Sequence, residues 1–268
     1  MPLPPGTLLQ LLYVKERIGR LRPGTFIEIG VGQGLVSKTL LGLGWSGVGL
    51  EVDPASTAAA RFNNASAIEK GRYAVAQENW TGTTASGSSI PASADLIISS
   101  MVLEHLDDRD EEEYFARCKK HLAPGGLCVL LVPASMRAWG IEDEIAGHYR
   151  RYSHSGVRER LARFGWKIDH IAGLTFPLSN LLLPISNWLV MRSEADKRSQ
   201  TMEQRTQASG RRRVYGKTIF PDIAAVILNE FVLYPFHLLQ KLFSKSERAL
   251  VLYVECVPAS GQARGSMR

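Results

Sequence analysis

The chain has 268 residues, enough for one large domain with a well-buried core or for a domain with a substantial insertion. Its three cysteines are far apart in the sequence and odd in number, which argues against a disulfide framework and against a cluster of metal ligands. The first residues lack a basic region followed by a long apolar run, so we expect no secretory signal and a cytoplasmic protein.

The first elements in chain order are an amphipathic helix over residues 7–20 and an apolar strand over 25–30. The strand runs into a turn that contains Gly30, Gly32 and Gly34. Glycines at this spacing let backbone N–H groups approach a ligand closely at the start of the following helix. The turn is therefore a candidate ligand-binding loop.

Glu28 lies two residues before the first of these glycines and adds a negative charge beside the turn. This charge suits a cationic, phosphate-free ligand with an amino acid moiety and does not suit a pyrophosphate. A dinucleotide site needs the pattern G-x-G-x-x-G, but Leu35 and Ser37 stand where its third glycine would have to be. The remaining alternative is an ordinary turn without a ligand. The segments that follow argue against it, because they recur in the right order.

Two further carboxylates follow predicted strands. The strand over 46–52 ends at Glu51, and an acidic side chain at the tip of the second strand of such a fold can accept both hydroxyls of a ribose. A helix over 54–69 and a short strand over 72–77 come next. Glu78 follows that strand and is a candidate partner for an adenine amino group. Taken alone, either carboxylate could equally be solvated at the surface.

Strands and helices continue to alternate through the middle of the chain. A buried strand is predicted over 94–100, a helix over 110–121 and, after a Pro-Gly-Gly turn, a strand over 126–132. A helix over 155–164 and a strand over 166–171 follow. This order predicts an α/β fold with a doubly wound, seven-stranded, mostly parallel sheet, in which ligands bind beyond the carboxyl ends of the strands.

The E-x-G-x-G-x-G turn, the acidic end of the second strand, the LEHL segment and the L-x-P-G-G turn together resemble class I S-adenosylmethionine-dependent methyltransferases. The resemblance covers about residues 20–172, and it is to the large bacterial small-molecule group that includes the ubiquinone-type O-methyltransferases. It implies a Rossmann-like methyltransferase fold with S-adenosyl-L-methionine as the cofactor. The cofactor-binding residues that it implies are Glu28, Gly30, Gly32, Gly34, Glu51, Glu78, Ser100 and Met101.

The segment after the fifth strand contains D-E-x-x-G-H-x-R-R-Y, which in the family that the chain resembles lies over the mouth of the active site. His148 is a candidate general base there, with Arg150 and Tyr152 orienting an anionic or hydroxylated acceptor. Glu104 and His105 are further candidates for the base. The alternatives are that the arginines only lock the segment through ion pairs, and that His105 packs against the cofactor pocket. No pair of histidines or aspartates has ligand spacing on a recognisable element, so no metal site is predicted.

The last third of the chain is interpreted as an insertion, residues 172–248, in front of a seventh, antiparallel strand over 249–257. The insertion begins with an uncharged stretch whose two prolines argue against one uninterrupted membrane span. Residues 192–217 hold eight Lys or Arg against three acids, which is +5 of the net charge of +6 and predicts an exposed loop. An apolar helix with a stripe of polar residues and a kink at a proline follows over 222–243.

The methyltransferase domain is thus predicted to comprise residues 1–171 plus 249–257, and a tail over 258–268 is expected to be disordered. Two apolar segments on either side of a basic loop suit an interfacial membrane anchor, with the loop attracted to anionic lipid. They also suit a lid over a cavity for a lipid-like acceptor, a homodimer interface, or helices that cover a sheet edge. A nucleic-acid partner is not expected, because few aromatic residues lie among the basic ones.

These patterns predict a methyltransferase that acts, at oxygen, on a hydrophobic or membrane-associated small molecule, in the cytoplasm or at the inner face of the membrane. One alternative is a soluble methyltransferase of a polar small molecule such as a sugar. An alternative of another class is a non-catalytic scaffold that binds S-adenosylmethionine. The intact acidic residues, glycine turn and His148 argue against the scaffold.

Overall fold

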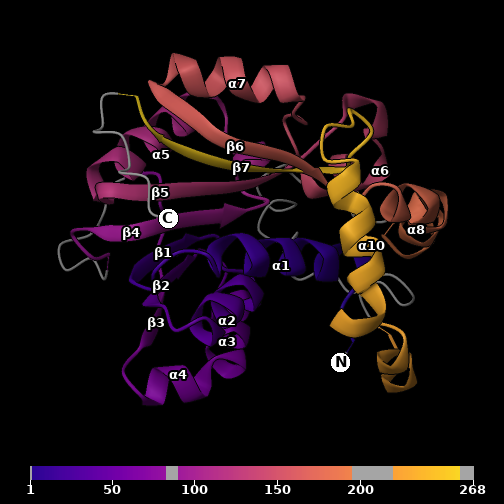
Figure 1. Ribbon diagram of the computed structural model, residues 1–268, viewed down its shortest axis with the longest axis horizontal. Coiled ribbons are helices and arrows are strands. Elements are labelled where there is room, and N and C mark those ends of the chain that lie inside the picture. The colour runs from indigo at the N-terminus through magenta and orange to yellow at the C-terminus, as the bar shows by residue number, and fades with distance from the viewer. Residues whose placement is uncertain (1, 83–89, 195–219, 260–268) are drawn as a thin grey trace.

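The computed structural model describes residues 2–82, 90–194 and 220–259. These residues form a seven-stranded sheet with the strand order β3-β2-β1-β4-β5-β7-β6 (Figure 1). Only β7 runs antiparallel to its neighbours, β5 and β6. The predicted fold class and the antiparallel seventh strand are therefore confirmed. The strands are β1 Thr25–Ile29, β2 Ser46–Glu51, β3 Tyr73–Gln77, β4 Ala94–Ser100, β5 Leu122–Pro133, β6 Trp166–Leu174 and β7 Val251–Pro258.

Helices cover both faces of the sheet, because successive side chains of its buried strands point to opposite faces. In β4, Leu96 and Ile98 pack under α1 and α2, whereas Ile97 packs under α5 and α7. Figure 1 shows α1 and α2 on one side of the strands and α5 and α7 on the other. The helices around the sheet are α1 Pro5–Ile18, α2 Leu35–Gly42, α3 Pro54–Asn63, α4 Ala65–Glu69, α5 Asp108–His121, α6 Ile141–Ala146 and α7 His154–Arg163, with short 3₁₀ helices η1 Leu103–His105 and η2 Met136–Ala138.

Two of the predicted elements have boundaries that differ from the structure. The single helix predicted over 54–69 is broken at Asn64, whose side-chain amide donates to the carbonyl oxygens of Gly34 and Ala60 instead of continuing the helix. Strand β5 begins at Leu122 and includes the Pro-Gly-Gly sequence, with a register shift in its pairing to β4. The loop predicted over 81–93 lies largely outside the described residues.

The described part of the predicted insertion contains the helices α8 Leu178–Glu194 and α10 Glu230–Leu242 and a 3₁₀ helix, η4 Asp222–Val226. The single helix predicted over 222–243 is therefore wrong. The side chain of Asn229 caps the backbone N–H of Val232 at 3.0 Å and starts α10 separately. None of the described helices is both long and apolar enough for a membrane span. Residues 195–219, which hold most of the predicted basic loop, and 260–268, most of the predicted tail, lie outside the described residues.

Helix α10 turns its polar stripe toward the protein. His237 and Gln240 are fully buried, and the Gln240 amide donates to the carbonyl oxygen of Leu9 in α1 at 3.0 Å. His237 Nε2 lies 2.7 Å from a carboxylate oxygen of Glu16, also in α1. By contrast, Phe231 is 89% exposed. An amphipathic helix on a folded domain normally faces the other way, so α10 leaves an apolar surface outside.

The three cysteines, far apart in the sequence, meet in the core. Cys128 of β5 lies opposite Cys256 of β7, and Cys118 of α5 packs in the same apolar cluster. All three thiols are free and fully buried. Burial raises the pKa of the Cys118 and Cys256 thiols. They act as apolar packing residues.

Candidate active site

Of the three glycines in the turn after β1, only Gly32 has room for a Cβ atom. All three glycines have positive φ angles, which favour glycine over other residues. A Cβ on Gly30 would collide with the Val102 side chain, and one on Gly34 would collide with Asn64. A Cβ on Gly32 would meet nothing within 4 Å. Gly30 and Gly34 are therefore required by packing, whereas Gly32 presents its backbone to open space.

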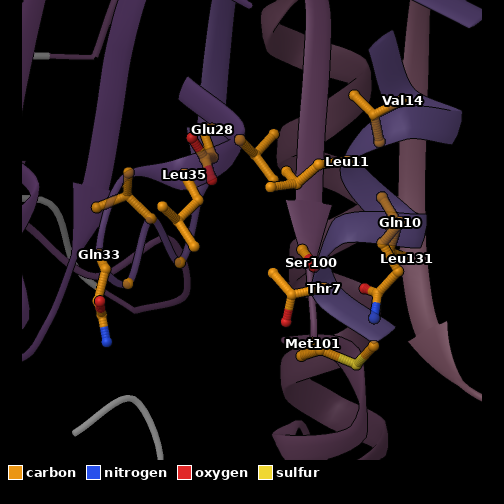
Figure 2. Close-up of a pocket in the computed structure, with 14 residues that line it drawn as sticks. Thr7, Gln10, Leu11, Val14, Glu28, Gln33, Leu35, Ser100, Met101 and Leu131 are labelled. Atoms are coloured by element: carbon orange, nitrogen blue, oxygen red, sulfur yellow. The ribbon is translucent and has the colours of Figure 1, made fainter. Parts of the chain in front are cut away.

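A cavity of about 270 Å³ lies between this turn, helix α1 and the end of β4. Figure 2 shows Thr7 and Gln10 of α1 near Ser100 and Met101 at the end of β4, with Glu28 on the other side. Glu28 is 2% exposed, and burial raises the pKa of its carboxyl to about 8 even though the Ser37 hydroxyl donates to it. A cationic group in this cavity would restore the ionised form of Glu28.

A second, larger cavity of about 780 Å³ lies beyond the carboxyl ends of β1, β2 and β4 and shares Gly30, Gly32, Ser100 and Met101 with the first. Glu51 and Glu78, at the ends of β2 and β3, both line it. The Glu51 carboxylate accepts hydrogen bonds from the backbone N–H groups of Gly32, Val52 and Asp53 at 2.8–3.0 Å. These bonds hold the carboxylate at the cavity wall.

The far end of the larger cavity contains Glu104 and His105 from η1 and His148 from the turn after α6. His148 Nδ1 lies 2.8 Å from an oxygen of Asp143, and its Nε2 lies 3.9 Å from an oxygen of Glu104. The rings of His105 and His148 meet edge to face with their centroids 4.8 Å apart. The backbone N–H of Tyr149 donates to the carbonyl oxygen of Glu104 at 2.8 Å and ties the two segments together.

Asp143 sets the orientation of the His148 ring. Burial raises the pKa of Asp143, but hydrogen bonds from His148 and Arg151 outweigh this effect and leave the pKa below its usual value. The ionised carboxylate accepts from Nδ1–H of His148 and, at 2.7 Å, from Arg151. In the neutral ring, Nε2 is then the atom with a free lone pair, and it points toward Glu104.

Glu104 is fully buried, and burial raises the pKa of its carboxyl to about 8. Neither of its oxygens makes a hydrogen bond to another described residue. Buried carboxylates without partners are unfavourable, because they lose hydration without any compensating interaction. Such a group at a cavity wall is a candidate for a functional role.

Residues 9–171 match the protein family described as "Methyltransferase domain". The chain belongs to this family. No curated protein matches the methyltransferase by sequence. Among solved structures, it is similar to the glycopeptide N-methyltransferase MtfA complexed with S-adenosyl-L-methionine, with 18% identity, a TM-score of 0.50, and coverage of 62% of this chain and 86% of that chain.

The methyltransferase is also similar to two further solved structures. One is the mitomycin 7-O-methyltransferase MmcR, with 18% identity, a TM-score of 0.48, and coverage of 61% of this chain and 50% of that chain. The other is an S-adenosylmethionine-dependent methyltransferase from Clostridium acetobutylicum ATCC 824, with 12% identity, a TM-score of 0.47, and coverage of 62% and 82%.

The structure places the predicted site residues of the methyltransferase in two groups. Glu111, buried in α5, holds Arg150 at 2.8 Å and Tyr152 at 3.4 Å, and neither of these residues lines the cavity. Their positions favour the alternative of an internal lock over the predicted contact with the acceptor. The remaining predicted residues line one or both cavities, except Gly34, which packs against α3. They are Glu28, Gly30, Gly32, Glu51, Glu78, Ser100, Met101, Glu104, His105 and His148.

Three residues of the methyltransferase site were not predicted. Asp143 was noted only as part of the motif, although it orients His148. Thr7 and Gln10 line the smaller cavity from α1. Helix α1 precedes the sheet in the chain, and its sequence has no glycine-rich turn or acidic strand end like those that indicated the other cavity residues.

Proposed function

We propose that this methyltransferase transfers a methyl group from S-adenosylmethionine to an oxygen atom of a hydrophobic, membrane-associated small molecule. The observation that carries the choice of acceptor is the apolar surface outside α8 and α10, next to the cavity with His148. The finer classification within the ubiquinone-type group is not needed for this proposal.

The two joined cavities suit the cofactor. The larger cavity, of about 780 Å³, has a volume in the range usual for small-molecule sites, and the smaller one extends it toward Glu28. Glu28 would meet the cationic amino acid end, Glu51 the ribose hydroxyls and Glu78 the adenine amino group, with the backbone of Gly32 close to the ligand. When bound, S-adenosylmethionine supplies an electrophilic methyl group on a sulfonium that leaves readily. The protein has to align the acceptor, exclude water and remove a proton.

Proton removal is assigned to the pair Asp143–His148. Nε2 of His148 takes the proton of the acceptor hydroxyl, and the ionised Asp143 stabilises the resulting imidazolium through Nδ1–H. A positioned base of this kind typically contributes about 10²–10⁴-fold to the rate. Alignment of acceptor and cofactor in the shared cavity supplies the remainder, up to roughly 7–11 kcal/mol of the barrier in favourable cases.

The apolar surface supports a hydrophobic acceptor. Of the 18 exposed large apolar side chains among the described residues, 14 lie on α8, on η4 and the residue after it, and on α10 and the residue after it. Exposed apolar side chains gathered on so few elements indicate an interaction surface. We call this set the outer apolar surface; it consists of Leu181, Leu182, Ile185, Trp188, Met191, Ile223, Val226, Ile227, Phe231, Tyr234, Phe236, Leu238, Leu242 and Phe243.

Helix α6 connects this surface to the cavity. Ile141 and Ile145 of α6 pack against Val190 of α8, and the Ser186 hydroxyl donates to Glu142 at 2.8 Å. Glu142 and Ala146 of the same short helix line the larger cavity. An acceptor that partitions into a lipid surface would therefore reach the cavity along α6. The net charge of +5 in residues 192–217 would attract anionic headgroups to the same part of the chain.

Sedimentation of the full-length protein with liposomes tests the membrane contact. We expect binding to anionic liposomes, and a loss of binding in the double variant Phe231→Asp/Leu242→Asp, whose side chains are 89% and 81% exposed on α10. Phe62→Asp is the matched control, because Phe62 is 83% exposed on α3, away from this surface. Absence of binding by the unaltered protein, or equal loss in the control, would contradict the membrane proposal.

A polar acceptor such as a sugar is the second candidate, favoured by polar side chains in the larger cavity that include Asn79, Asp110 and Glu142. Methyl transfer from labelled S-adenosylmethionine to a long-chain phenol and to a sugar separates the two. Preference for the sugar would assign the outer apolar surface to another use, a homodimer interface, which analytical ultracentrifugation detects.

A further inference from the structure

Three potential metal ligands meet in the larger cavity. They are Glu104 and His105 from η1 and His148 from the turn after α6, and one ligand atom from each lies within 4.8 Å of the others. No metal site is predicted from the sequence, since His148 is far from Glu104 and His105 in the chain and shares no regular element with them. The hydrogen bond from the backbone of Tyr149 to Glu104 brings the two segments together.

Glu104 points to a ligand that carries positive charge. Its side chain is fully buried, and its two oxygens make no hydrogen bond to another described residue. Nε2 of His148 lies 3.9 Å from one of these oxygens, too far for a hydrogen bond. A cation between these atoms would satisfy the carboxylate and the imidazole at once.

His148 has the surroundings usual for a metal-binding histidine. Metal-bound imidazoles almost always donate their other N–H to a carboxylate or carbonyl, which fixes the tautomer and the ring orientation. Asp143 provides this contact at 2.8 Å and is itself held by Arg151 and by the backbone N–H of Gly140. The lone pair of Nε2 is therefore directed toward the centre of the cluster.

We propose that Glu104, His105 and His148 bind one divalent transition-metal ion, Zn²⁺ or Fe²⁺. Imidazole and carboxylate ligands suit both ions, whereas Mg²⁺ prefers oxygen ligands. Tetrahedral bonds of about 2.0–2.1 Å place ligand atoms about 3.3 Å apart, so binding draws the cluster together by about 1 Å. Three protein ligands leave a coordination position open toward the cavity.

The metal site extends the proposed function. The identity of the group that would occupy the open coordination position rests on that proposed function. An acceptor hydroxyl bound there would have a lower pKa, because the ion acts as a Lewis acid. With the ion bound, His148 would be a ligand and no longer the base. The metal-bound hydroxyl would then lose its proton to solvent water, and its oxygen would take the methyl group. The binding of the ion does not depend on methyl transfer; only the binding of the acceptor to the open coordination position does.

Titration calorimetry of the full-length, chelator-treated protein with Zn²⁺ tests the site. We expect one Zn²⁺ per chain, and an affinity that falls roughly 100-fold or more in Glu104→Gln and His148→Gln and about 10–100-fold in Asp143→Asn. His154→Asn is the matched control, because His154 also lies beside a carboxylate, at 3.2 Å from Glu247, but does not line the cavity. Thermal melting of each variant shows that it is folded.

X-ray absorption of the Zn²⁺-loaded wild-type protein needs no variant. We expect only nitrogen and oxygen ligands with two imidazoles. Substoichiometric binding, an affinity unchanged in Glu104→Gln and His148→Gln, or sulfur in the zinc shell would overturn the proposal. S-adenosylmethionine is titrated into the same chelator-treated protein, and failure to bind it contradicts the proposed function, whereas failure to bind Zn²⁺ contradicts the metal site alone.

Discussion

Replacing Glu51 by alanine is expected to abolish most of the cofactor affinity. The carboxylate lies at the wall of the larger cavity, fixed by the N–H groups of Gly32, Val52 and Asp53 at 2.8–3.0 Å. Hydrogen bonds to a charged group contribute about 1.5–3 kcal/mol each, so the loss of two bonds to ribose hydroxyls weakens binding roughly 10²–10⁴-fold. The freed N–H of Gly32, part of the cofactor loop, adds to the effect.

Calorimetric titration with S-adenosylmethionine and S-adenosylhomocysteine measures this loss. Both ligands share the ribose, so both should weaken by a similar factor in Glu51→Ala. In Glu51→Gln, one acceptor oxygen remains and the loss should be smaller. Glu69→Ala removes an exposed carboxylate on α4, outside both cavities, and serves as the control. An affinity of Glu51→Ala equal to that of the control would refute the assignment of the ribose to the end of β2.

Three further predictions concern stability. Asp143→Asn should lower the free energy of unfolding by about 3–5 kcal/mol in urea titrations, because it leaves the buried Arg151 charge unpaired. The control is Glu230→Gln, which removes a charge from an exposed ion pair and should cost less than about 1 kcal/mol. Equal effects would contradict the role of Asp143. The pKa of Glu104 is raised to about 8 in the folded state, so its contribution to stability is present below pH 4.5 and is lost as the pH rises to 8. In chelator-treated protein, Glu104→Gln should therefore flatten the decline of stability with pH. An unchanged slope would argue against a raised pKa of Glu104. Gly34→Ala should lower the melting temperature, because the added methyl group would collide with Asn64. Gly32→Ala should mainly weaken cofactor binding. The reverse pattern would show that the packing role and the binding role have been assigned to the wrong glycines.

The parts of the fold that follow from local patterns were predictable. Apolar strands such as 94–100, the glycine turn and the acidic ends of β2 and β3 each depend on residues close together in the chain, so spacing alone locates them. The alternation of strands and helices then fixes the end of the sheet at which Glu51 and Glu78 meet, because the carboxyl ends of parallel strands lie together.

The contacts around His148 and the orientation of α10 could not be predicted in the same detail. The contact of His148 with Glu104 depends on how the chain returns across the sheet after β5, which no short-range pattern specifies. Arg150 could be recognised as an ion-pair residue only once Glu111 of α5 was seen beside it. The orientation of α10 was also hidden, since a polar stripe normally faces water, and here buried bonds to Leu9 and Glu16 reverse it.

Helix α1 has the smaller cavity on one side and α10 on the other. Thr7 and Gln10 line the smaller cavity, while the carbonyl of Leu9 and the carboxylate of Glu16 hold α10. Any ligand of the outer apolar surface that shifts α10, and with it α1, therefore changes the affinity for the cofactor. By thermodynamic reciprocity, the cofactor changes the affinity for that surface ligand by the same factor. A single helix of fourteen residues thus makes attachment and cofactor loading one coupled equilibrium.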